Sequence, residues 1–147
     1  MSANPEADRQ VDKFAGDLAT ASRMNGWQLL RTMAGNADRM FQLKKNNVTI
    51  PFTVHISLSG NGFGGLTAEK AHGLVANGRE HLVLLRDGGG GFFIPNPILK
   101  RLMPQFSIAQ ESGAVKINEN KVRAQARFRD ADDLLELLEA RSPSPAS

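Results

Sequence analysis

Cysteine is absent from all 147 residues of the chain. No disulfide can therefore form, and both Cys₄-type zinc sites and thiol nucleophiles are excluded. The sequence also has no apolar run long enough to span a bilayer, and its first ten residues, MSANPEADRQ, are too polar for a signal peptide. These absences predict a cytoplasmic protein without a membrane segment, whose stability comes from an apolar core.

Acidic residues are scarce in two stretches of the chain, although the net charge is only +3. Residues 27–66 contain Arg31, Arg39, Lys44 and Lys45 against Asp38 alone. Residues 115–129 are likewise basic, with Glu119 as their one acid. A mildly basic composition of this kind permits a nucleic-acid partner, DNA or RNA, without requiring one.

Hydrophobic periodicity predicts an α/β chain with one domain over residues 1–141 and a disordered tail at 142–147. Strict alternation of apolar and polar residues over 48–58 is typical of a strand with one buried face. The other expected strands are 27–33, 39–44, 81–86 and 92–95, the expected helices are 6–24, 67–76, 97–103 and 130–141, and a β-hairpin is expected over 114–128. Short turns predict that the first three strands form an antiparallel meander.

The order of these elements, which is helix, three strands, helix, strand, resembles the common core of the PD-(D/E)XK restriction-endonuclease-like superfamily. Several phrases are similar to those of small bacterial members: GW-QLLR ahead of an acid, ISLSGNGFGGLT at a strand end, LVLL, FFIPN, a KIN hairpin and a DLLELL helix. The resemblance covers most of residues 6–140. It implies a mixed sheet with an αβββαβ core, to which a C-terminal hairpin and helix are added.

The resemblance also implies a magnesium-dependent nuclease site. It requires an acid at the start of the second strand, and on the third strand a Glu or Gln, one spacer and a Lys. Carboxylates there hold Mg²⁺, which polarises the phosphate and lowers the pKa of a bound water, while the lysine stabilises developing negative charge. Asp38 matches the acid, Thr53 stands where Glu or Gln is expected, and His55 where Lys is expected. Because neither Thr nor His is a ligand that Mg²⁺ prefers, the motif is incomplete.

Other residues are candidates to complete this site. Glu69 and Glu6 are candidate metal ligands beside Asp38, and Lys70 is a candidate catalytic residue together with Asp38 and His55. The candidate nucleic-acid contacts are Arg31, Lys44, Lys45 and Thr53. Such contacts bind backbone phosphates without reading bases. The expected function is therefore either metal-dependent phosphodiester hydrolysis or nucleic-acid binding by a catalytically silent relative.

Two other functions remain open at this point. The missing Glu-x-Lys favours a protein-interaction module without chemistry. Residues 60–65, GNGFGG, match the G-x-G-x-x-G motif of dinucleotide- and flavin-binding proteins, with Asp87 downstream as a ribose-binding acid. Against that motif, the preceding strand alternates apolar and polar residues, whereas a central parallel strand is usually apolar on both faces. The glycines are then expected to form a loop between a strand and a helix.

Overall fold

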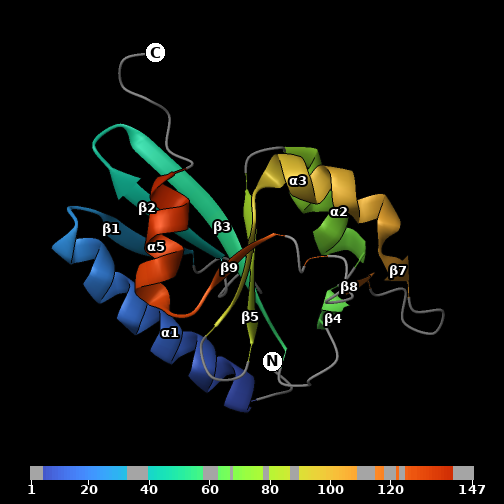
Figure 1. Ribbon diagram of the computed structural model, residues 1–147, viewed down its shortest axis with the longest axis horizontal. Helices are drawn as coiled ribbons and strands as arrows, with labels where there is room; N and C mark the ends of the chain where they lie inside the picture. The colour runs from blue at the N-terminus through green and yellow to red at the C-terminus, as the bar shows by residue number, and fades with distance from the viewer. Residues whose placement is uncertain are drawn as a thin grey trace.

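The computed structural model describes residues 5–32, 40–57, 63–66, 68–77, 80–86, 90–108, 115–117, 122 and 125–140. In chain order the elements are α1 (Pro5–Met24), β1 (Gln28–Thr32), β2 (Met40–Lys45), β3 (Val48–Ser57), β4 (Phe63–Leu66), α2 (Ala68–Asn77), β5 (His81–Arg86), β6 (Gly91–Ile94), α3 (Asn96–Leu102), the 3₁₀ turn η1 (Met103–Gln105), β7 (Ser107–Ile108), β8 (Val115–Ile117), β9 (Ala126–Phe128) and α5 (Ala131–Glu139). Figure 1 shows α1 and α5 on one side of the main sheet and α2 and α3 on the other. The α/β class is therefore confirmed.

Helix α1 covers one side of the sheet with an apolar stripe. Val11, Phe14 and Leu18 recur at helical spacing, and all three are buried in the core beneath the helix. The helix ends before Gly26, whose φ of 81° lies in the left-handed region that favours glycine. In the described part of the chain, no helix is both long and apolar enough to cross a membrane.

Strands β1, β2 and β3 form the antiparallel meander that the short turns predict. Thr32 pairs with Met40 across β1 and β2, and Met40 pairs in turn with Thr53 across β2 and β3. The β2–β3 turn contains Asn46 at φ 55°, a left-handed conformation that asparagine tolerates better than most residues. This hairpin fixes the register of β3, the strand that carries the candidate site.

The main sheet has six strands in the order β1-β2-β3-β5-β6-β9. Strands β3 and β5 run parallel, so the chain must cross over between them, and it does so through β4 and α2. The remaining neighbours in this sheet are antiparallel. A small second sheet has the order β4-β8-β7.

Each face of the main sheet has its own apolar core. On β3, the side chains of Ile50, Phe52, Val54 and Ile56 pack into the core under α1 and α5, which we call the α1/α5 face. On β5, Leu82 and Leu84 pack into the core under α2 and α3, the α2/α3 face. The alternation predicted for the third strand is confirmed, and it leaves the polar residues of β3 on the α2/α3 face.

Two sequence-based expectations were wrong in detail. Residues 114–128 do not form a hairpin, because β8 pairs with β4 and β7 whereas β9 pairs with β6. The two strands belong to different sheets, with Ile117 buried in the α2/α3 core and Phe128 in the α1/α5 core. The C-terminal segment is thus integral to the main sheet rather than an addition to it. Similarly, part of the expected glycine loop at 60–65 belongs to strand β4.

Candidate functional site

Thr53 and His55 lie together on the α2/α3 face of strand β3. Their neighbours Phe52, Val54 and Ile56 point into the opposite core, and side chains alternate along a strand. Thr53 is buried, with 1% of its surface exposed, and His55 is half-buried. The structure therefore brings these two predicted site residues to one place in the sheet.

Three other predicted residues of the site have no described side chain. Asp38 is not among the described residues, and strand β2 begins two residues later, at Met40, the partner of Thr53. Glu69 and Lys70 lie in the first turn of α2, where the backbone alone is described. What the structure does give is the register of β2 on β3.

A carboxylate that the sequence analysis missed lies against Thr53. The Thr53 hydroxyl Oγ1 donates a hydrogen bond to Oε2 of Glu80 at 2.5 Å. Glu80 is 9% exposed and immediately precedes strand β5, where His81 pairs with Phe52 of β3. An acid two residues before the buried run LVLL was visible in the sequence, but only the parallel pairing of β3 and β5 shows that it reaches Thr53.

Asn96, at the start of α3, holds the backbone around Glu80. Its buried side-chain amide donates hydrogen bonds to the carbonyl oxygens of Leu74 and Glu80, both at 2.7 Å. Its backbone N–H donates to Nδ1 of His81 at 2.9 Å. These bonds connect α2, β5 and α3, and a buried polar network whose members are satisfied makes its surroundings rigid.

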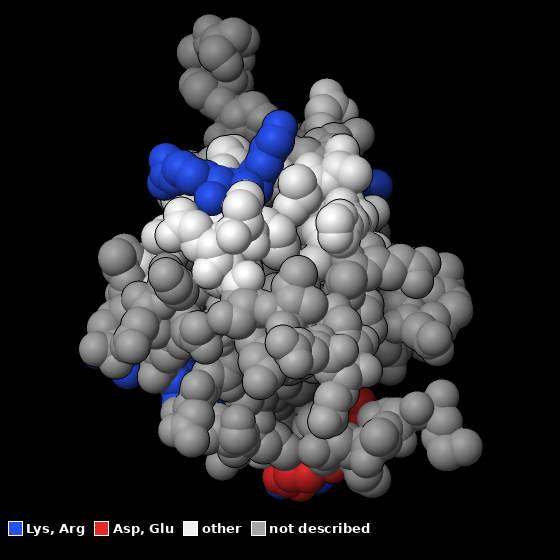
Figure 2. Space-filling model, turned by 90° about the vertical axis from the view of Figure 1, so that its right-hand side faces the viewer, with Lys and Arg blue, Asp and Glu red and all other residues white. Residues whose placement is uncertain are grey.

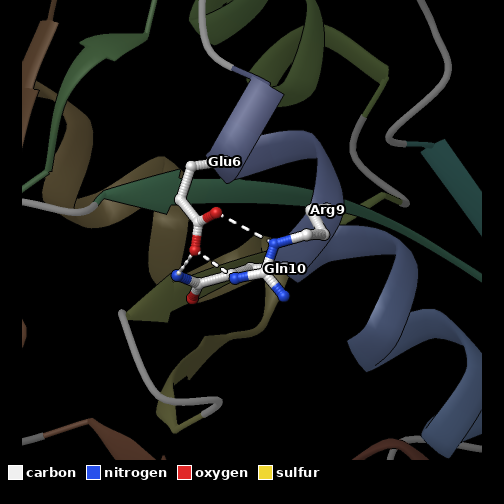
Figure 3. A network of polar contacts seen from close by, with 3 residues as sticks. All are labelled: Glu6, Arg9 and Gln10. Atoms are coloured by element: carbon white, nitrogen blue, oxygen red, sulfur yellow. Dashed lines mark hydrogen bonds and ion pairs between the residues drawn. The ribbon is translucent and has the colours of Figure 1, made fainter.

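Glu6 lies elsewhere, at the start of α1. Figure 3 shows its carboxylate facing Arg9 and Gln10 of the same helix, and both side chains donate hydrogen bonds to it. The bonds from Arg9, followed by that from Gln10, hold the pKa of Glu6 below its usual value. Glu6 lines a groove of about 450 Å³ with Phe14 and Ala131, on the α1/α5 face. The structure thus does not bring Glu6 to Thr53.

The predicted nucleic-acid contacts are dispersed over the sheet. Arg31 lies on the α1/α5 face, where NH1 donates to Asp12 at 2.7 Å and the guanidinium stands 5.3 Å from the ring centre of Phe41. Lys45, at the β2–β3 turn, donates to the carbonyl of Asn25 at 3.2 Å. Lys44 is exposed and faces the same side as Thr53, because its neighbour Leu43 points into the α1/α5 core. Of these three cations, only Lys44 shares the face of Thr53 and His55.

A further basic region lies on the side of α2 and α3. Figure 2 shows a group of Lys and Arg side chains at the top of this side, with others at the lower left and next to Asp and Glu at the bottom. Helix α3, which lies at the top in Figure 1, ends with the exposed residues Lys100 and Arg101. These two positions are candidate phosphate contacts that the sequence analysis did not select.

The described residues by themselves do not fit a magnesium site. Beside Thr53 they supply one carboxylate, that of Glu80, whereas Mg²⁺ is usually held by several oxygen ligands, including one or two carboxylates. In the described part of the chain there is no group of three or more His, Asp or Glu residues that could hold a metal ion. A complete site therefore needs side chains from outside this part, and Asp38 is the first candidate by sequence.

Comparison with solved structures supports the fold described above. No protein-family model matches the chain, and no curated protein matches it. Among solved structures, the chain is similar to Hjc, a Holliday junction resolvase from the archaeal hyperthermophile Archaeoglobus fulgidus, with a TM-score of 0.55 and 15% sequence identity. The match covers 88% of this chain and 96% of that chain. At this identity the likeness shows the fold alone, and it confirms the restriction-endonuclease-like core expected from the sequence.

Proposed function

We propose that this protein is a nucleic-acid-directed member of the nuclease-like fold, and that it works through the α2/α3 face of strands β2 and β3. The observation that carries the proposal is the placement of Thr53 and His55. They occupy the strand position at which the resemblance expects Glu or Gln, a spacer and Lys, and the neighbouring strand brings the carboxylate of Glu80 to Thr53. The resolvase likeness supports DNA as the nucleic acid.

The proposal has a binding form and a catalytic form. In the binding form, His55 and nearby cations hold the phosphate backbone, which requires no metal ligand set. Thr53 was predicted as a further contact, but it is 1% exposed and its hydroxyl is bonded to Glu80, so it supports this surface from beneath. In the catalytic form, Asp38 would hold Mg²⁺ with Glu69 or Glu80, and His55 or Lys70 would lie near the phosphate. The donor set of the described residues favours the binding form, because it includes one carboxylate beside Thr53.

The surface available for contact supports this assignment. Met40, Gln42 and Pro51 are half-buried and face the same side as Thr53, since their neighbours Phe41, Leu43 and Phe52 enter the opposite core. With exposed Lys44 beside them, they form a strand surface on which a nucleic-acid backbone can lie. We expect binding that weakens steeply with salt and depends little on base sequence.

The test is a paired binding and cleavage experiment on wild-type protein. Four-way junction, duplex, single-stranded DNA and RNA are each titrated at several salt concentrations and then incubated with Mg²⁺ or Mn²⁺. If the catalytic form is right, metal-dependent cleavage is lost in Asp38→Ala and reduced in His55→Ala. Asp17→Ala is the matched control, because Asp17 is an exposed acid of α1 that pairs with Lys13 on the other side of the sheet.

Each result has a distinct meaning. Binding without cleavage, unchanged in Asp38→Ala, supports the silent form. Failure to bind any of the four nucleic acids at low salt rejects the proposal and leaves the protein-interaction module. A yellow preparation with flavin absorbance would instead favour the dinucleotide-binding alternative at residues 60–65.

A further inference from the structure

Three exposed polar residues form a row across the first three strands, close to the β2–β3 turn. Gln28 pairs with Lys44 and Lys44 pairs with Thr49, so the three side chains share one face of the sheet. This is the α2/α3 face, because the neighbouring Leu43 is buried in the opposite core. The row therefore lies on the same face as His55, towards the other end of strand β3.

Helices α2 and α3 do not cover this end of the sheet. Figure 1 shows them beside β5, whereas β1, β2 and the β2–β3 turn lie on the opposite side of the molecule. Among the described residues, the α2/α3 core accordingly includes side chains of β5 and β6 but none of β1, β2 or β3. Gln28, Lys44 and Thr49 are all exposed, so their polar groups can reach a ligand that lies on this face.

The charge of Lys44 is not offset by a carboxylate. Residues 39–68 contain no Asp or Glu, and neither does strand β1. Among the described residues, no ion pair involves Lys44. Lys45 is different, because it donates to the carbonyl of Asn25 and lies 5.3 Å from the ring centre of Trp27 on the other face. An ammonium group flanked by the amide of Gln28 and the hydroxyl of Thr49 is suited to an anion.

The row stands on a rigid hairpin. Directly beside it, Leu43 and Ile50 are 0% and 2% exposed, and the rings of Phe41 and Phe52 stack further along the same two strands. The turn is closed by Asn46 in the left-handed conformation. Because the backbone is already fixed, a ligand has only side chains to order, which lowers the entropic cost of binding.

The row lies about 20 Å from His55. Thr49 and His55 are six residues apart on β3, and a strand rises about 3.3 Å per residue. In a duplex this length corresponds to about six base pairs at 3.4 Å each. It is also comparable with the major groove, which is about 12 Å wide, together with the phosphate groups on its two borders. One straight duplex along β3 can therefore present a phosphate to each end of this face.

We propose that the Gln28–Lys44–Thr49 row binds a backbone phosphate of a double-stranded nucleic acid that also contacts His55. Lys44 supplies the charge, while Gln28 and Thr49 each supply a neutral hydrogen-bond donor. Contacts of this kind position a duplex without reading its bases. The inference rests on the proposed function, and it adds that the ligand is a duplex of at least about eight base pairs that lies along β3.

The first experiment measures the duplex affinity of Lys44→Gln as a function of salt. We expect roughly fivefold weaker binding at low salt and a salt slope smaller by about one unit, because one phosphate is no longer neutralised. Lys44→Arg keeps the charge and should restore the wild-type slope. Arg23→Gln is the matched control, because Arg23 is an exposed cation at the end of α1, on the other side of the sheet. It should change neither the affinity nor the slope.

The second experiment varies the length of the duplex. Hairpin-closed DNA stems of about four to about fourteen base pairs are titrated at constant salt, and single strands of the same lengths are the comparison. We expect wild-type affinity to rise steeply up to about eight base pairs, where both ends of the face are occupied, and only slowly beyond. Lys44→Gln should lack the steep rise. Single strands that bind as tightly as duplexes, with the same dependence on Lys44, overturn the proposal of a duplex.

These outcomes separate the inference from the proposed function. If wild type binds no nucleic acid, the proposed function fails and the inference fails with it. If wild type binds duplex and Lys44→Gln binds equally well, with the same salt slope and length dependence, the inference alone is wrong. Thermal unfolding checks that Lys44→Gln is folded. Gln28→Ala is an independent test, because it should weaken binding without changing the salt slope.

Discussion

The two faces of the main sheet are built from the same strands but bury different kinds of side chain. On the α1/α5 face the packing is mainly apolar, with the rings of Phe41 and Phe52 stacked 5.4 Å apart and the buried hydroxyl of Ser22 bonded to the carbonyl of Leu18 within α1. On the α2/α3 face an apolar core is also present, but the buried polar residues Thr53, Glu80 and Asn96 lie beside it. Adjacent residues of β3, Phe52 and Thr53, therefore belong to two different environments.

This difference between the faces suggests that one serves mainly stability and the other serves function. Burying a polar group costs free energy unless it is hydrogen-bonded, and among the described residues no buried side-chain nitrogen or oxygen lacks a partner. A protein that needed only a stable sheet could have used apolar residues on both faces. The polar network on the α2/α3 face marks the side on which we expect function.

The largest effect should come from removing a ring on the α1/α5 face. Phe52→Ala should destabilise the protein by about 3–5 kcal/mol, because removing this fully buried, stacked phenyl ring leaves a cavity in the core. Urea unfolding followed by circular dichroism measures the loss. Thr49→Ala, at an exposed position of the same strand, is the control. A loss below about 1 kcal/mol would mean that packing on the α1/α5 face contributes little to the free energy of unfolding.

Removing the amide of Asn96 tests the α2/α3 face. Asn96→Ala leaves the buried carbonyls of Leu74 and Glu80 without their donor, at about 1–3 kcal/mol for each unsatisfied group. The same unfolding assay measures it. Asn25→Ala removes one hydrogen bond, from the side-chain amide of an exposed residue to the carbonyl of Ala21. It should lower the free energy of unfolding much less. Equal losses in the two variants would contradict the importance of the buried network.

A smaller effect is expected for the hydroxyl that meets Glu80. Thr53→Val keeps the shape of the side chain but removes the donor to the carboxylate, at about 1–3 kcal/mol. Combining it with Glu80→Leu should cost less than the sum of the single changes, because the pair is then removed together. Additive losses would show that the two groups do not interact in solution.

The smallest effect concerns acid stability near α5. The backbone N–H of Arg129, and then its guanidinium, donate to Asp133 and lower the pKa of this carboxyl below 3.8. A depressed pKa stabilises the folded state above the unfolded pKa, and the contribution is lost as the pH falls through the folded value. Asp133→Asn should therefore be slightly less stable than wild type at pH 7, and the difference should shrink as the pH falls through the lowered pKa of Asp133. Asp132→Asn, at an exposed position of the same turn, is the control for the loss of one negative charge at this end of the helix.

The sequence predicted the elements with strong periodicity and failed where partners are distant. Alternation along β3 and the helical stripe of α1 are local signals, and both predicted the buried residues correctly. The partners of β8 and β9 are set by which core Ile117 and Phe128 enter, and no local pattern contains that information. Short strands are most prone to this error, because three residues carry little periodicity.

The candidate site shows the same limit. Thr53 and His55 were selected by their position in one strand, whereas Glu80 joins them through the parallel pairing of β3 and β5. A small pocket lined by Arg86 of β5 and Arg127 of β9 likewise gathers residues that are about 40 positions apart in sequence. Spacing within a strand is predictable from side-chain alternation, but convergence between strands depends on the topology of the sheet.

The packing of α5 beside α1 in Figure 1 also has a consequence for synthesis. Leu134 and Leu138 of α5 share one core with Val11 and Leu18 of α1, so that core cannot close until residues near 138 have left the ribosome. Contacts of such long sequence separation also make folding slow. Until residues of α5 emerge, the apolar stripe of α1 stays exposed on the nascent chain, and this nascent form is the one that chaperones would have to protect from aggregation.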